Sequence, residues 1–328
     1  AYPIVERHSW SAAGADLPLA CCGSPAPWRW VVVCEALSQR VRRSCGQGSD
    51  ADAAVFHMTH RCCAALRKWR LGPNMPGMKH HLYILTGASR GMGLAMAEQL
   101  LQAGHALLCI SRNANPDLES AAQKAAVPLT QWTHDLADGT GAASRLSDWL
   151  AGQNPDDLAS VSLINNAGVI PPILPVSQSQ PADLAWALRV GLEAPMALCA
   201  AFLGATRSWT LPRKVLNISS GLGRYPMASQ AGYCAAKAGM DHFTRCMALD
   251  EALQDHGARV CSLAPGVIDT DMQVQMRGAP GEAFPDQNKF LQLKANGQLS
   301  SAPQAAAQVL AFLARPAFGE QAVADVRG

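Results

Sequence analysis

Hydrophobic residues change their spacing near residue 78 of this 328-residue chain. From there on, short apolar runs alternate with longer segments whose apolar residues recur at the 3.6-residue period of an α-helix. The short runs predict strands at 81–85, 106–110, 128–132, 161–164, 215–218, 259–263 and 322–326. The longer segments predict helices at 91–103, 117–126, 141–153, 181–208, 229–256 and 302–313.

Strands that alternate with helices indicate βαβ units, whose parallel strands lie in one sheet covered on both faces. Right-handed crossovers leave a doubly wound sheet as the simplest arrangement. We therefore predict an α/β fold: a Rossmann-like, doubly wound, parallel seven-stranded sheet with helices on both faces. Such sheets bind ligands at the carboxyl ends of their strands, so the residues that follow each strand are the ones to search.

The first 77 residues show no sustained period and are interrupted repeatedly by glycine and proline. We expect a poorly ordered, irregular N-terminal extension at 1–77 and a Rossmann-fold domain at 78–328. The extension is basic, with a possible short helix at 53–69, which leaves nucleic-acid binding by this segment as a minor hypothesis. Its cysteines lack the spacing of a zinc site, so we predict no metal.

Composition excludes several classes of protein. A chain that is 49% hydrophobic and 16% charged is not wholly disordered, and a net charge of +2 argues against a dedicated nucleic-acid binder. No apolar run approaches the roughly 20 residues of a membrane-spanning helix. The cysteines after residue 78 fall mostly in predicted strands or helices and are expected to be buried. The odd number of these five cysteines, without a convincing secretory signal, favours a cytoplasmic protein.

A glycine-rich turn follows the first predicted strand and leads directly into the first predicted helix. Glycines let the backbone turn sharply and approach a pyrophosphate, and the free N–H groups of a helix N-terminus favour an anion. Taken alone, the turn is also compatible with an ordinary strand-to-helix connection. Its spacing is G-x-x-x-G-x-G, and its candidate cofactor-binding residues are Gly87, Ser89, Arg90, Gly91, Met92 and Gly93.

The end of the second predicted strand bears on the choice of dinucleotide. The sequence Ser111-Arg112-Asn113 holds no acidic residue that would bind an adenosine ribose diol. Arg112, together with Arg90, can instead pair with a 2′-phosphate. We therefore expect NADP(H) rather than NAD(H) as the cofactor.

Three residues are candidates for the chemistry. Tyr233 and Lys237 stand four residues apart in an apolar-periodic segment, so both project from one face of one helix. A nearby ammonium is expected to lower the pKa of the phenol from its usual value of about 10, which suits proton transfer. Ser220, at the end of the fifth predicted strand, would hydrogen-bond the same carbonyl oxygen as Tyr233. The adjacent Ser219 is disfavoured by its spacing from Tyr233.

Five motifs in order resemble the short-chain dehydrogenase/reductase family: 86–93, 165–168, Ser220, the Tyr233 and Lys237 pair, and Pro265-Gly266 with Thr270. The resemblance covers 78–328 and none of 1–77. It implies that Lys237, beside Tyr233, holds the nicotinamide ribose, and that relatives pair through their two long helices as dimers or tetramers. It places Asp135 by the adenine and assigns the cofactor cleft and the nicotinamide carboxamide to Asn166, Ala167, Gly168, Pro265, Gly266, Val267 and Thr270.

The chain departs from the family's pattern at Gly191. Relatives usually carry an asparagine there, which anchors a water that links the lysine to solvent. Gly191 either leaves room for another water or requires that the relay run through a different group. A cofactor-binding regulator without catalytic activity is therefore a second hypothesis beside an active enzyme.

The long segment 269–300 carries Met272, Met276, Phe284 and Phe290. These residues are compatible with a mobile lid over an apolar substrate, and equally with a loop that has its own small core. The sequences 264–273 and 293–299 are similar to those of sepiapterin reductases and bacterial benzil reductases. Sepiapterin reductases hold their pterin with an acidic residue near the C-terminus. No carboxylate follows Asp325 in this sequence, which favours an aromatic or vicinal dicarbonyl.

The resulting prediction is an NADP(H)-dependent oxidoreductase that reduces a ketone or a vicinal dicarbonyl by hydride transfer, with Tyr233 as the general acid. The alternatives are a pterin carbonyl reductase and the non-catalytic regulator. We expect a small-molecule carbonyl substrate and a homodimer or homotetramer, with neither nucleic acid nor a membrane as partner.

Overall fold

The computed structural model describes residues 79–327, and the expectations for 1–77 lie outside this part of the chain. Seven parallel strands form one sheet in the order β3-β2-β1-β4-β5-β6-β7. This order confirms the predicted doubly wound fold. The strands are β1 (His80–Thr86), β2 (Ala106–Ser111), β3 (Leu129–Thr133), β4 (Leu158–Asn165), β5 (Arg213–Ile218), β6 (Arg259–Ala264) and β7 (Val323–Asp325).

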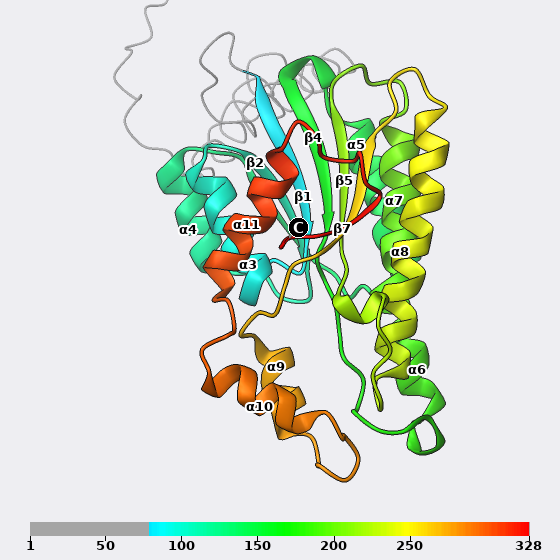
Figure 1. Ribbon diagram of the computed structural model, residues 1–328. Helices are drawn as coiled ribbons and strands as arrows, with labels where there is room; N and C mark the ends of the chain where they lie inside the picture. Colours follow the sequence, from blue (N-terminus) through cyan, green and yellow to red (C-terminus); the bar gives the residue numbers. More distant parts are fainter. Residues whose placement is uncertain (1–78, 328) are drawn as a thin grey trace, which may run out of the picture. The chain divides into compact units, whose positions relative to one another are not determined.

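Helices cover both faces of the sheet (Figure 1). Helices α3 (Gly91–Gln102), α4 (Pro116–Ala125) and α11 (Ala302–Ala314) pack on one face, and α5 (Gly139–Ala151), α7 (Ala194–Ala205) and α8 (Ala231–Ala252) pack on the other. Side chains alternate along each strand, so Ile84 enters the core under α5 and α7 while its neighbour Leu85 enters the core under α3 and α11. Both residues are fully buried.

The helix N-termini differ in a way that bears on function. The side chain of Asn115 caps α4 by accepting a hydrogen bond from the Asp117 N–H, and Ser301 and Gln304 form a capping box at α11. Arg90 precedes α3 without any side-chain cap. The first N–H groups of α3 therefore remain available to a ligand.

The predicted helix 181–208 contains a π-helical turn. Helix α6 (Pro181–Leu188) passes through the π-turn Arg189–Glu193 into α7. A Cβ at Gly191 would lie 3.1 Å from the Cβ of Ala236 on α8, so glycine permits the two helices to approach closely here. π-turns interrupt α-helices mostly as single insertions, which the hydrophobic period alone does not predict.

The segment Pro181–Ala205 also corrects the expectation that no segment is long and apolar enough to cross a membrane. It has 25 residues, and an 18-residue window within it has a mean hydropathy of 1.4. Its buried side chains include Val190, Leu198 and Phe202, which lie in the core shared with α5. Its apolar composition is therefore accounted for by packing within the domain.

Two short helices that were not predicted lie within 269–300: α9 (Asp271–Gly278) and α10 (Gln287–Ala295). Figure 1 shows them together beyond the carboxyl ends of the strands. Ion pairs join Asp269 to Arg277, at 3.5 Å, and to Lys294. Phe284 and Phe290 stack with their ring centroids 5.6 Å apart. We call residues 269–300 the cap segment.

The cysteines of the described residues are all free. Cys109, Cys199 and Cys261 are buried, as expected, and Cys234 is partly buried. Cys246 is exposed, so the expectation of burial was wrong for this residue. It lies on α8, one face of which borders the core while the other meets solvent.

Candidate active site

The candidate residues for cofactor and substrate share one cleft of about 750 Å³, built from the loops after the strands. This is where a doubly wound sheet places its ligands. Its lining includes Gly87, Ser89, Arg90, Gly91, Met92, Gly93, Arg112, Asp135, Asn166, Ala167, Gly168, Ser220, Tyr233, Lys237, Pro265, Gly266, Val267 and Thr270.

The glycine turn is held against the end of β4. The Thr86 hydroxyl accepts hydrogen bonds from the N–H groups of Asn166 and Ala167, each at 2.9 Å. The Asn166 amide donates in return to the carbonyl oxygens of Thr86 and Gly87, at 2.9 and 3.2 Å. A Cβ at Gly93 would lie only 2.1 Å from the Gly87 oxygen, so this close approach requires glycine. The first turn of α3 is thereby fixed beside the end of β1.

Arg112 and Asp135 lie at the part of the cleft formed by β2 and β3. Arg112 is exposed directly after β2, which ends without a carboxylate. The Ser111 hydroxyl accepts a hydrogen bond from the Ala88 N–H at 2.9 Å, which ties this strand end to the glycine turn. Asp135 accepts a hydrogen bond from the Ala137 N–H and so shapes the turn after β3.

Arg90 makes a contact that the sequence did not reveal. Its Nη1 lies 2.7 Å from the Asp271 carboxylate at the start of α9, and both side chains are exposed. The Asp271 carboxylate would therefore compete with the expected 2′-phosphate for Arg90. An exposed pair of this kind is worth only about 0–1 kcal/mol, so a phosphate can displace it.

The three candidates for the chemistry come together in this cleft. Ser220 directly follows Ser219 at the end of β5, and Tyr233 and Lys237 lie in the first turns of α8. Tyr233 is 8% exposed and Lys237 is 4% exposed. The Lys237 Nζ donates to the Ile218 carbonyl oxygen at 2.7 Å and lies 5.8 Å from the centroid of the Tyr233 ring. The Ser219 hydroxyl is buried without a partner.

Burial governs the pKa of both titratable groups. It raises the pKa of Tyr233 to about 12, opposed by hydrogen bonding with Ser220. This direction is opposite to the expected lowering, because burial outweighs the hydrogen bond with Ser220. Burial lowers the pKa of Lys237 to about 8, opposed by the carboxylate of Asp241. Tyr233 is thus protonated at neutral pH, as a proton donor must be.

Gly191 lies beside these residues without opening free space toward α8. The gap that the missing side chain leaves is occupied by the methyl group of Ala236, one residue before Lys237. Of the two possibilities raised by Gly191, room for another water on this side is therefore disfavoured.

The substrate side of the cleft contains residues that sequence reasoning missed. The cap segment forms an apolar cluster with Ile170, Ile173 and Tyr233 itself. Gln273 is the exception in polarity: it lines the cleft, is 7% exposed, and its Oε1 has no partner. It shares the buried face of α9 with Met276, three residues later in the sequence. This i, i+3 spacing was the only sequence pattern that could have indicated that Gln273 faces the cleft.

Residues 81–280 match the short chain dehydrogenase family. The chain belongs to this family. A benzil reductase ((S)-benzoin forming) of Bacillus cereus is 34% identical over 218 residues, covering 66% of this chain and 88% of that protein. A sepiapterin reductase of Meriones unguiculatus is 31% identical over 255 residues, covering 74% and 94%. An Agrobacterium tumefaciens structure named for a 2-deoxy-d-gluconate 3-dehydrogenase, with bound NADP, has a TM-score of 0.62 at 25% identity and covers 76% and 95%.

Membership of the short chain dehydrogenase family makes this protein an oxidoreductase of a group that uses nicotinamide cofactors. The predicted resemblance is confirmed in the same stretch of chain that carried the motifs.

Proposed function

We propose that this chain is an NADP(H)-dependent reductase that converts a ketone or vicinal dicarbonyl into an alcohol. The observation that carries the proposal is the meeting of Ser220, Tyr233 and Lys237 in the cleft that also contains the glycine turn. The similarity to benzil reductases supports a vicinal dicarbonyl, since benzil is an aromatic diketone.

The residues of the cleft fit a dinucleotide. The uncapped N-terminus of α3 offers N–H groups to a pyrophosphate, and a Cβ at Gly91 would meet nothing nearer than Thr270, at 3.8 Å. Arg112, exposed after a strand that ends without a carboxylate, is suited to a 2′-phosphate. The related structure with bound NADP supports the same choice. When bound, this cofactor supplies the hydride.

The chain's own residues supply the proton and orient the carbonyl. One hydride added at the carbonyl carbon and one proton added at the oxygen convert C=O into CH–OH. Tyr233 donates that proton from its hydroxyl. The Ser220 hydroxyl donates a hydrogen bond to the same oxygen and stabilises its developing negative charge. The buried ammonium of Lys237 stabilises the phenolate that remains on Tyr233.

The cap segment supports an apolar substrate with a second polar atom. Met276, Phe290 and Ile170 provide an apolar wall next to Tyr233. Gln273 adds a side-chain amide on the cleft side of α9, whose N–H groups can donate hydrogen bonds to a ligand. A vicinal dicarbonyl presents one oxygen to Tyr233 and a second that the Gln273 amide N–H groups can bind.

The direct test is Tyr233→Phe, assayed by NADPH oxidation with benzil and with aliphatic diketones. Loss of the proton donor is expected to lower kcat by about 10²–10⁴-fold. Tyr83→Phe is the matched control, because Tyr83 lies on β1 with its ring against His105, away from the cleft. A folded Tyr233→Phe protein with wild-type turnover would show that the assigned acid is wrong.

Pterin carbonyl reduction is the second candidate, supported by sepiapterin reductases at 31% identity. A comparison of kcat/KM for sepiapterin and benzil on the wild-type protein separates the two. Tight NADPH binding without oxidation on any carbonyl would favour the non-catalytic regulator instead.

We also propose a homodimer or homotetramer in a reducing cytoplasm, acting on a small molecule. Leu249 of α8 and Leu253, the residue directly after this helix, are 71% and 84% exposed, which supports pairing of α8 with a second copy. The five cysteines of the described residues are free thiols, as suits a reducing compartment. Sedimentation of Leu253→Lys beside the wild type tests the pairing, since the introduced charge should make the variant dissociate while the wild type stays paired.

A further inference from the structure

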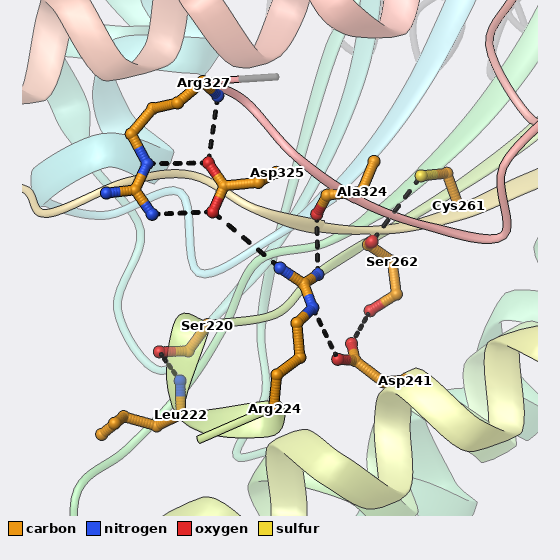
Figure 2. A network of polar contacts seen from close by, with 9 residues as sticks. All are labelled: Ser220, Leu222, Arg224, Asp241, Cys261, Ser262, Ala324, Asp325 and Arg327. Carbon is orange, nitrogen blue, oxygen red and sulfur yellow. Dashed lines mark hydrogen bonds and ion pairs between the residues drawn. The ribbon is translucent and has the colours of Figure 1, made fainter.

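A network of alternating charges lies beside the candidate active site (Figure 2). Arg224 directly follows the 3₁₀ turn Gly221–Gly223 and is its central member. Its Nη2 donates to the Ala324 carbonyl oxygen at 2.7 Å, its Nε lies 3.5 Å from the Asp241 carboxylate, and its Nη1 lies 3.9 Å from that of Asp325. Arg327 donates hydrogen bonds to both carboxylate oxygens of Asp325, each at 2.8 Å.

Asp241 connects this network to the helix of the candidate catalytic residues. It stands one helical turn beyond Lys237 and two beyond Tyr233 on α8, and it is 1% exposed. The Ser262 hydroxyl of β6 donates to its Oδ1 at 2.6 Å. A buried carboxylate is costly unless it is paired, and Arg224 is the cation that pairs with it from outside the helix.

The turn that carries Ser220 lies directly on this part of α8. A Cβ at Gly223 would be 2.9 Å from the Asp241 Oδ2 and 3.0 Å from the Lys237 carbonyl oxygen. The Ser220 hydroxyl accepts a hydrogen bond from the Leu222 N–H within the same turn, at 3.2 Å. Arg224, at the end of the turn, is therefore placed to fix the position of Ser220 relative to Tyr233.

We propose that Arg224 and Asp241 are positioning residues, whose ion pair fastens the Ser220 turn and β7 to helix α8 and so sets the geometry of Ser220, Tyr233 and Lys237. This inference rests on the proposed carbonyl reduction. The pair acts through the three catalytic groups and touches neither the hydride nor the carbonyl. Because a displacement of about 1 Å at a reacting group can cost about 100-fold, the expected loss falls on kcat rather than KM.

The pair also sets the charge environment of Lys237. Removal of the Asp241 charge takes away the group that opposes the lowering of the Lys237 pKa by burial, so the pKa falls below about 8. Removal of Arg224 leaves the carboxylate less neutralised, so the pKa of Lys237 rises. The titratable and charged groups that face this region are Tyr233, Cys234, Lys237 and Asp241 of α8, Arg224 after the 3₁₀ turn, Cys261 of β6, Asp325 of β7 and Arg327.

The test compares Asp241→Asn, Arg224→Met and the double variant of the full chain, with NADPH and the best dicarbonyl substrate. Each single variant is expected to lower kcat by tenfold or more with KM nearly unchanged. The alkaline limb of the kcat profile should move to lower pH in Asp241→Asn and to higher pH in Arg224→Met. Because the residues act as a pair, the double variant should lose no more than the worse single variant.

Two further variants keep the test informative. Arg213 and Glu251 form a comparable buried pair between β5 and the other end of α8, at 3.7 Å. Glu251→Gln should lower thermal stability without moving the pH profile. If Asp241→Asn does not fold, Ser262→Ala removes the hydrogen bond to the carboxylate and keeps the charge; it should lower kcat by about two- to fivefold.

The outcomes separate this inference from the proposed function. Wild-type kcat and an unmoved pH profile in Arg224→Met and Asp241→Asn, with Tyr233→Phe inactive, would overturn the positioning role alone. Wild-type turnover in Tyr233→Phe, or no NADPH oxidation by the wild-type chain, would overturn the proposed function. A third result is that Arg224→Met and Asp241→Asn lose kcat without a shift in their pH profiles, and that Glu251→Gln loses kcat to the same extent. This result would show that the pair has a structural role only and would also overturn the inference.

Discussion

The half of the cleft assigned to the cofactor and the half assigned to the substrate differ in whether backbone or side chains form them. The cofactor half is formed mainly by closely packed backbone, which belongs to the glycine turn, the uncapped N-terminus of α3 and the loop at Asn166. The substrate half consists of side chains on two short helices, joined by ion pairs at Asp269 and by an apolar cluster. A side chain added at a closely packed glycine displaces the backbone itself, whereas the replacement of a side chain that lines the cleft changes only the contacts of that side chain. Mutations in the glycine turn should therefore abolish cofactor binding, and mutations of side chains that line the cleft should change preference.

Gly93→Ala tests the first half of this comparison and should have the largest effect. The added Cβ would lie 2.1 Å from the Gly87 oxygen, so either the turn or α3 must move. We expect NADPH affinity, measured by fluorescence titration, to fall by at least about 100-fold. Gly204→Ala in α7 is the control, since a Cβ there meets nothing within 4 Å. Unchanged affinity in Gly93→Ala would mean that the cofactor does not depend on this turn.

Arg112→Glu should change cofactor choice. An acidic residue after β2 repels a 2′-phosphate and can accept hydrogen bonds from a ribose diol. We expect the KM for NADPH to rise by about 10- to 100-fold while that for NADH stays the same or falls, which makes NADH the internal control. An equal rise for both cofactors would contradict a role in recognising the phosphate.

Gln273→Leu tests the second half of the comparison. The leucine keeps the size of the side chain but removes the only polar group on the buried face of α9 apart from the backbone. The KM for a vicinal dicarbonyl should rise by about tenfold, equivalent to one hydrogen bond, with little change for a simple aryl ketone. A parallel rise for both substrates would indicate that Gln273 supports the shape of the cleft and not the second carbonyl.

Asp269→Asn should have the smallest effect. Hydrogen bonding with Lys294, and the charge of Arg277, hold the pKa of the Asp269 carboxyl below its usual range. The contribution of these ion pairs is therefore present above the ordinary carboxyl pKa and is lost as the pH falls through the lowered value. Because the pairs are partly exposed, we expect kcat/KM to change less than about threefold, and less still at high salt. A large effect that salt does not weaken would show that the cap segment depends on Asp269 for more than charge.

The sequence patterns that pointed to the cofactor half are local, and the structure brings their residues together in one cleft. The glycine spacing dictates a backbone path within eight residues, and the four-residue spacing of Tyr233 and Lys237 dictates a shared helix face. The doubly wound sheet followed from general rules of βαβ connection.

The rest depended on contacts between distant parts of the chain. The pairing of Arg90 with Asp271 joins residues 181 positions apart, and neither residue carries a local signal for it. Helices α9 and α10 are short, with 8 and 9 residues, and consist largely of polar residues, so the sequence pattern did not distinguish them from loop. The burial of Asp241 depends on Arg224 and on Ser262 of β6, which only the folded sheet brings to α8.

The contact between Gly191 and Ala236 has a consequence for which side chains these two positions can carry together. An asparagine at position 191 would place its Cβ 3.1 Å from the methyl group of Ala236, so one of the two helices would have to shift slightly. The two positions are therefore coupled, and a smaller residue at 236 should make a side chain at 191 easier to accommodate. In a library that varies both positions, Gly191→Asn should be recovered together with Ala236→Gly and rarely with Ala236 unchanged.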